Sequence, residues 1–112
     1  MVARTMAARE VLVAGFSVED EGDTLVLHGD LDVASAPVLE AVLAERTPDG
    51  DGAHLTLDLS DVPFADSSAI RVMIQLARSV APGTLRLRGT QPVVRQVFAL
   101  TSLEEIANIE LV

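Results

Sequence analysis

The chain has 112 residues, enough for one domain and too few for two. Its net charge is -9, from 17 acidic residues against 8 basic ones, so nucleic acids and acidic membranes are poor partners. The absence of cysteine excludes disulfides and thiol nucleophiles, and two histidines leave little material for a metal site. The hydrophobic fraction is 49% and the aromatic fraction only 3%, which predicts one core of aliphatic side chains.

The N-terminal third predicts a leader followed by a hairpin. Residues 1–9 are expected to be a flexible leader, since the apolar stretch after them is short and runs into acidic residues, unlike a signal peptide. No apolar run approaches the ~20 residues of a membrane helix, so we expect a cytoplasmic protein. Residues 10–18 and 24–29 predict two strands. The acidic turn between them contains Gly22, which is expected to take a positive φ.

The middle of the chain predicts a crossover between parallel strands. A helix is predicted from about Ser35 to Arg46, with Ser35 as its cap and Pro37 in its first turn. Residues 47–52 are rich in Gly, Pro and Asp and end this helix. Residues 53–59 alternate as a strand, and a helix placed between two strands favours their parallel pairing.

The clearest helix spans residues 67–80. Its apolar residues recur at helical spacing, with arginines and a glutamine on the other face. The predicted inner stripe is Ile70, Met73, Ile74 and Ala77, and the outer stripe is Arg71, Gln75 and Arg78.

The remaining elements complete an α/β domain. Residues 84–88 predict a strand whose Arg86 and Arg88 face solvent. Thr90 and Pro92 open a helix with Val94, Val97 and Phe98 inward, and residues 106–112 form either a strand or a short helix. The order β-β-α-β-α-β-α predicts a mixed four- to five-stranded sheet with helices packed against it.

One segment combines groups that carry chemistry. Residues 57–70 read as strand, loop and helix start, with Asp66, Ser67 and Ser68 where the helix begins. This end of a helix presents unpaired backbone N–H groups, and it follows the carboxyl end of a strand, where α/β sheets place their sites. Ordinary helix capping by Asp and Ser explains such a pattern when it is taken alone.

The surrounding residues resemble a known signature. Asp58-Leu59-Ser60 followed by Phe64-Ala65-Asp66-Ser67-Ser68-Ala69 resembles the motif of STAS domains that act as anti-sigma factor antagonists. Gly29-Asp30-Leu31-Asp32 is similar to that family's Gly-Glu-Leu-Asp, and residues 92–103 are similar to its last core helix. The resemblance extends over about residues 11–109, and it implies a single STAS domain at residues 10–112.

The resemblance also implies a function in transcription regulation, of the kind that bacteria use in stress response and sporulation. The unphosphorylated form would bind an anti-sigma factor, which is an ATP-dependent serine kinase, and release the sigma factor. Phosphorylation of Ser67 would reverse binding, and a serine phosphatase would reset the cycle. No catalytic residue and no cofactor is implied, and the implied partner-binding residues are Asp30, Asp32, Asp66, Ser67, Ser68, Ala69 and Arg71. Asp30 replaces the family's usual glutamate, and Ala69 replaces a glycine, which adds a methyl group beside Ser67.

Other functions stay open. A STAS module can instead serve a signalling complex or a lipid-transport complex without regulation by phosphorylation. A nucleotide-binding sensor would need a Gly-rich phosphate loop, which the sequence lacks. A serine hydrolase would need a base beside its nucleophile, but no Gly-x-Ser-x-Gly motif is present, and His28 and His54 are typical of ordinary strand residues.

Overall fold

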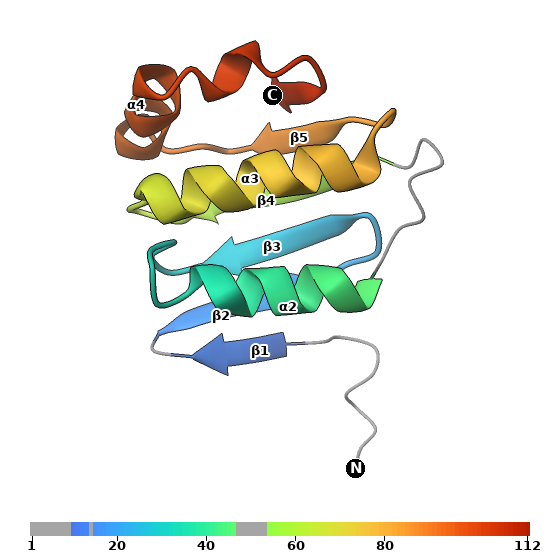
Figure 1. Cartoon of the computed structure of the whole chain (residues 1–112). Coiled ribbons are helices and arrows are strands. Elements are labelled where there is room, and N and C mark those ends of the chain that lie inside the picture. The colour runs from blue at the N-terminus through green and yellow to red at the C-terminus, as the bar shows by residue number, and fades with distance from the viewer. Residues whose placement is uncertain (1–9, 14, 47–53) are drawn as a thin grey trace.

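A mixed sheet with its strands in chain order organises the molecule (Figure 1). The computed structural model describes residues 10–13, 15–46 and 54–112, so the predicted leader (1–9) and the turn at 47–52 lie outside the described residues. The first three strands pair antiparallel and the last three join in parallel. The strands are β1 (Glu10–Val13), β2 (Phe16–Asp20), β3 (Thr24–His28), β4 (Leu55–Asp61), β5 (Leu85–Arg88) and β6 (Ile109–Leu111).

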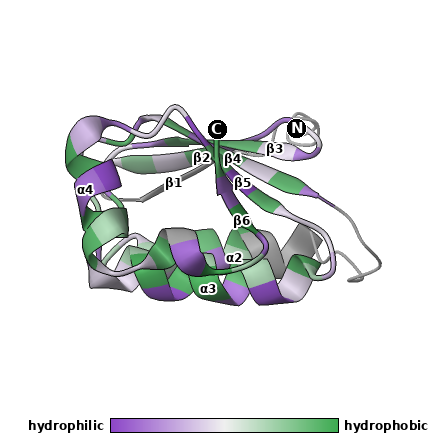
Figure 2. Cartoon of the chain, turned by 90° about the horizontal axis from the view of Figure 1, so that it is seen from above, coloured by the Kyte–Doolittle hydropathy of each residue, from purple (hydrophilic) through white to green (hydrophobic). Residues whose placement is uncertain are grey.

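The helices α2 and α3 lie side by side on one face of this sheet, and α4 stands at one end (Figure 2). Their bounds are Ala36–Arg46 for α2, Ser67–Val80 for α3 and Pro92–Leu100 for α4, with a 3-10 turn at Leu103–Glu105. Each α-helix connects two parallel strands, which confirms the predicted α/β class. No helix in the described segments is long and apolar enough to cross a bilayer.

Within the described residues the sheet has six strands, not the four to five that the sequence predicts. The stretch at residues 10–18 is two strands, because Gly15 takes a φ of 80° and Val13 pairs antiparallel with Phe16. Of the two alternatives at residues 106–112, a strand or a short helix, the structure has the strand β6. Its pairing covers an otherwise unpaired edge of β5. Gly22 takes the expected positive φ, at 86°.

The core lies between the sheet and the helices. Alternate strand residues point toward the helices, as a period of two requires, and they are leucines for the most part. In α3 the buried face is wider than the predicted stripe: Ile70, Met73 and Ala77 are buried as expected, whereas Ile74 is only partly buried. The residues that join this face are Ala69, Val72, Leu76 and Val80.

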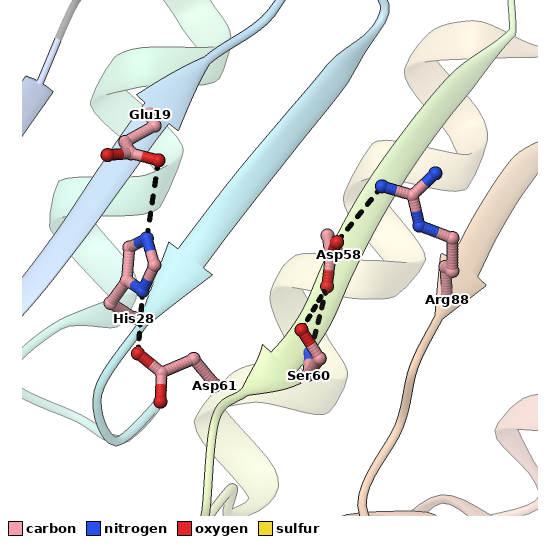
Figure 3. A network of polar contacts seen from close by, with 6 residues as sticks. All are labelled: Glu19, His28, Asp58, Ser60, Asp61 and Arg88. Carbon is pink, nitrogen blue, oxygen red and sulfur yellow. Dashed lines mark hydrogen bonds and ion pairs between the residues drawn. The ribbon is translucent and has the colours of Figure 1, made fainter.

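The other face of the sheet is polar, and cross-strand ion pairs tie its strands together (Figure 3). Arg88 Nη2 donates to Asp58 Oδ2 at 2.9 Å, and Arg86 Nε lies 3.4 Å from Glu110 Oε1. Partial burial pushes the pKa of Asp58 up, but hydrogen bonds from Ser60 and Arg88 outweigh it and leave the pKa below its usual value. Both arginines face solvent, as predicted, and each is paired with an acid.

His28 lies between two carboxylates on the same face (Figure 3). Its Nδ1 is 2.6 Å from Asp61 Oδ2, and its Nε2 is 3.4 Å from Glu19 Oε1. The hydrogen bond with Asp61 raises the pKa of His28, burial partly opposes this, and Glu19 adds to the rise. His54 is also in an ordinary structural role, because its Nδ1 accepts a hydrogen bond from the backbone N–H of Thr84 at 3.0 Å.

Candidate functional site

Ser67 lies at the first position of α3, at the carboxyl end of β4. The preceding residue, Asp66, caps the helix: its Oδ1 accepts a hydrogen bond from the backbone N–H of Ser68 at 2.8 Å. The Ser67 side chain is exposed. Within the described part of the chain its hydroxyl takes part in no hydrogen bond, so the oxygen is accessible at the helix start and no internal bond holds it.

The loop that carries Ser67 is joined to the loop after β3 by backbone hydrogen bonds. Leu31 N–H donates to the carbonyl of Phe64 at 2.9 Å, and Asp66 N–H donates to the carbonyl of Leu31 at 3.2 Å. These bonds form a parallel bridge between Leu31 and Ala65, both of which are buried. The structure therefore brings together two of the segments that carry the resemblance, 29–32 and 64–69.

The loop after β3 is held by its own polar groups. Asp32 Oδ1 accepts hydrogen bonds from the backbone N–H groups of Ala34 at 3.0 Å and Ser35 at 3.2 Å. The Ser35 hydroxyl donates to the carbonyl of Asp30 at 2.7 Å and accepts from Asp32 N–H at 2.9 Å. Ser35 directly precedes α2 and its carbonyl accepts a hydrogen bond from Leu39 N–H at 3.2 Å, so it stands at the predicted cap position. Its buried hydroxyl, however, points back into the loop, and within the described residues it bonds no N–H group of the helix. Asp30 stays exposed, and Asp32 is half-buried.

The predicted site residues on α3 divide between the surface and the core. Arg71 is exposed, and Ser68 is half-buried. Ala69 is 0% exposed, so its inclusion among partner-binding residues is wrong. Its side chain lies on the buried face of the helix, and the methyl group therefore does not obstruct the surface beside Ser67.

Three exposed apolar residues at this edge are missing from the predicted site. Val33 follows β3, Phe64 follows β4 and Val93 lies in the first turn of α4, so each of three neighbouring parallel strands is followed by one of them (Figure 1). Their exposed fractions are 73%, 45% and 56%. Phe64 belongs to the motif on which the resemblance rests, a sequence signal that could have identified it. Together with Ser67, the three residues make this edge a surface suited to a protein partner.

Solved structures share this fold. SpoIIAA, an anti-sigma factor antagonist, matches in its unphosphorylated form with a TM-score of 0.68 and 22% identity over 87% of each chain. Its phosphorylated form from Bacillus matches with a TM-score of 0.57 and 19% identity, over 95% of this chain and 91% of that one. The Thermotoga maritima protein TM1081 gives a TM-score of 0.68 and 23% identity over 85% of each chain. An anti-sigma factor antagonist from Mycobacterium paratuberculosis gives 0.66 and 24%, over 85% of this chain and 83% of that one.

A match at the level of sequence agrees with the shared fold. The family model described as "Mlab, STAS domain" matches residues 14–112. This range includes both joined loops and the helices α2, α3 and α4. The chain therefore belongs to the STAS domain family.

Proposed function

We propose that the chain is an anti-sigma factor antagonist whose partner binding is switched by phosphorylation of Ser67. The observation that carries the proposal is the exposed Ser67 hydroxyl, free of internal hydrogen bonds within the described residues, at an edge that also exposes Val33, Phe64 and Val93. The unphosphorylated form binds an anti-sigma factor that is also a serine kinase, and this binding releases the sigma factor. The chain is thus a binding partner and a substrate, with no catalytic step of its own.

The modification transfers the γ-phosphoryl group of ATP to the Ser67 oxygen. The serine O–H proton leaves and a new bond forms between the Ser67 oxygen and the γ-phosphorus. The bond from the γ-phosphorus to the β–γ bridging oxygen breaks, and ADP departs with its electron pair. A serine phosphatase returns the hydroxyl by hydrolysis of the same P–O bond. Apart from the kinase and the phosphatase, neither direction needs a co-reactant beyond ATP and water.

The electrostatics of this edge explain why a phosphoryl group would release the partner without unfolding the chain. The group adds about -1.5 to -2 charges. At a helix start this charge gains roughly 0.3–1 kcal/mol from the helix dipole. In a protein interface it must be desolvated beside Asp30, Asp32 and Asp66, and an unmatched buried charge costs on the order of 3–5 kcal/mol. We therefore expect the loss to appear in binding and not in folding.

The first test is the mass of the chain purified from its own cells. A species heavier by about 80 Da, one phosphoryl group, is expected in the wild type and in Ser68→Ala, and it is lost in Ser67→Ala. Ser68 is the matched control because it is the adjacent hydroxyl on the same helix turn. An unmodified wild-type chain under every growth condition would overturn the proposal.

The second test measures binding to the kinase partner directly. Ser67→Ala should bind with the wild-type Kd, whereas Ser67→Asp should raise the Kd by about 100-fold or more, which corresponds to about 2.7 kcal/mol. The melting temperature of Ser67→Asp should stay within a few degrees of the wild type. Unfolding of this variant would show that Ser67 serves the fold, and unchanged binding would contradict the switch.

A second candidate is a STAS partner module that is indifferent to phosphorylation, in a signalling complex or a lipid-transport complex. The observation that favours it is the name of the matching family model, "Mlab, STAS domain", which does not refer to anti-sigma factors. This candidate predicts a stable partner that co-purifies equally well with wild type and Ser67→Asp. The antagonist proposal predicts that the aspartate variant loses its partner.

A further inference from the structure

Arg71 follows Ser67 by four residues on α3, and residues at this spacing lie on the same face of a helix, one turn apart. Their Cβ atoms are then separated by about 5–6 Å. Both side chains are exposed. The long arginine side chain can therefore reach any group attached to the Ser67 oxygen.

The ion pairs of the described residues leave the guanidinium of Arg71 without a partner. Arg86 and Arg88 are also exposed, but each pairs with a carboxylate. The nearest acid in sequence, Asp66, accepts a hydrogen bond from Ser68 N–H at the cap. In a chain with a net charge of -9, a cation that has no acidic partner among the described residues is therefore available beside Ser67.

We propose that Arg71 is the internal counter-ion of phosphoserine at position 67. The inference rests on the proposed function only in that Ser67 is the modified residue. Two guanidinium N–H groups donate to two phosphoryl oxygens, the paired geometry that arginine favours with phosphate. The backbone N–H groups of Ser68 and Ala69 in the first helix turn already donate to Asp66, so the guanidinium supplies donors for this phosphate.

This pairing gives phosphorylation a second effect on the partner-binding edge. In the bare chain, Arg71 is a cation available to a carboxylate of the partner. In the phosphorylated chain, the guanidinium of Arg71 is paired with the phosphate and is no longer available to the partner. Phosphorylation therefore adds a negative charge and also withdraws a positive contact.

Arg78 is the matched control. It is an exposed arginine of the same helix, and it also has no ion pair within the described residues. It lies eleven residues beyond Ser67, which places it about 16 Å further along the helix axis. A substitution there removes the same charge and the same side chain, but no contact with a phosphate at Ser67.

The test uses the full chain with phosphoserine installed at position 67 by genetic encoding, so that no kinase is needed. The second ionisation of the phosphate is followed by ³¹P NMR as a function of pH at low salt. An i, i+4 ion pair of ordinary strength shifts this midpoint by roughly 0.3 pH unit. We expect R71Q to raise the midpoint by about that amount, with R78Q at the wild-type value and R71K close to it. The R71Q difference should shrink in about 1 M salt.

Equal midpoints for wild type and R71Q would overturn the inference, and so would an R71K midpoint equal to that of R71Q, because the effect would then not depend on charge. The unphosphorylated variants should have the melting temperature of the wild type. This result would distinguish pairing with the phosphate from a general role of Arg71 in folding. The outcome is independent of whether cells phosphorylate Ser67, since the phosphate is supplied synthetically. Failure of the cellular switch and failure of the pairing are therefore distinguishable.

Discussion

The substitution Asp66→Ala tests how much the Asp66 carboxylate contributes to the stability of the fold as the cap of α3. The substitution removes the acceptor of the 2.8 Å hydrogen bond from Ser68 N–H. Loss of an N-cap costs about 1 kcal/mol, and loss of a negative charge at a helix start costs roughly a further 0.5 kcal/mol. With 112 residues, 1 kcal/mol corresponds to about 4 °C in melting temperature. We therefore expect a decrease of about 6 °C.

Thermal unfolding followed by circular dichroism measures this decrease. Asp66→Asn keeps an acceptor oxygen at the cap and loses only the charge, so it should lose about 2 °C. Ser67→Ala removes a hydroxyl with no hydrogen bond in the described structure and should change the melting temperature by less than about 2 °C. If Asp66→Asn were as destabilised as Asp66→Ala, the hydrogen bond would not be the source of the stability. An unchanged Asp66→Ala would refute the cap itself.

Two further predictions concern the sheet. Gly29 has a φ of 102°, and a Cβ there would lie against the Gly15 carbonyl oxygen, so Gly29→Ala should lower the unfolding free energy in urea by about 2–4 kcal/mol. Gly22→Ala, at a similar φ but in open space, is the control and should lose less than half as much. The pKa of His28 is raised by Asp61 above the unfolded value of 6.5, so its stabilisation is complete below pH 6.5 and is lost as pH rises through the folded pKa. The unfolding free energy of the wild type, measured in urea, should therefore decrease as pH rises over that range. His28→Gln should show a smaller decrease, and the same decrease in both proteins would contradict the pairing.

Local patterns in the sequence predicted the elements that depend on local interactions. The helix α3 begins and ends where the sequence placed it, because the Asp66 cap and the apolar spacing act within one element. The apolar run that contains Gly15 predicts one strand over residues 10–18, whereas the structure has two strands there. The strand β6 stayed open because its pairing depends on β5, twenty residues away, and not on its own composition.

In the candidate site, too, local patterns predict some features, whereas contacts between distant segments determine others. Ser67 and its exposure follow from the motif and from the helix start. The contact between Leu31 and Ala65 joins segments more than thirty residues apart, so no local pattern reveals it. The burial of Ala69 could have been predicted, because it is four residues before the buried Met73 on the same helix face. The motif taken as one unit predicts a surface position for Ala69, whereas the helical spacing predicts its burial.

The bridge between the two loops has a consequence for how such a domain can diversify. Peptide groups make the bridge, through the N–H and carbonyl of Leu31, so it does not depend on which side chains the exposed loop positions carry. On the proposed function, replacement of Val33 or Phe64 can therefore change the choice of partner while the Ser67 oxygen stays at the same place. Paralogues in one cell could in this way acquire separate partners and still share a common chemistry of control.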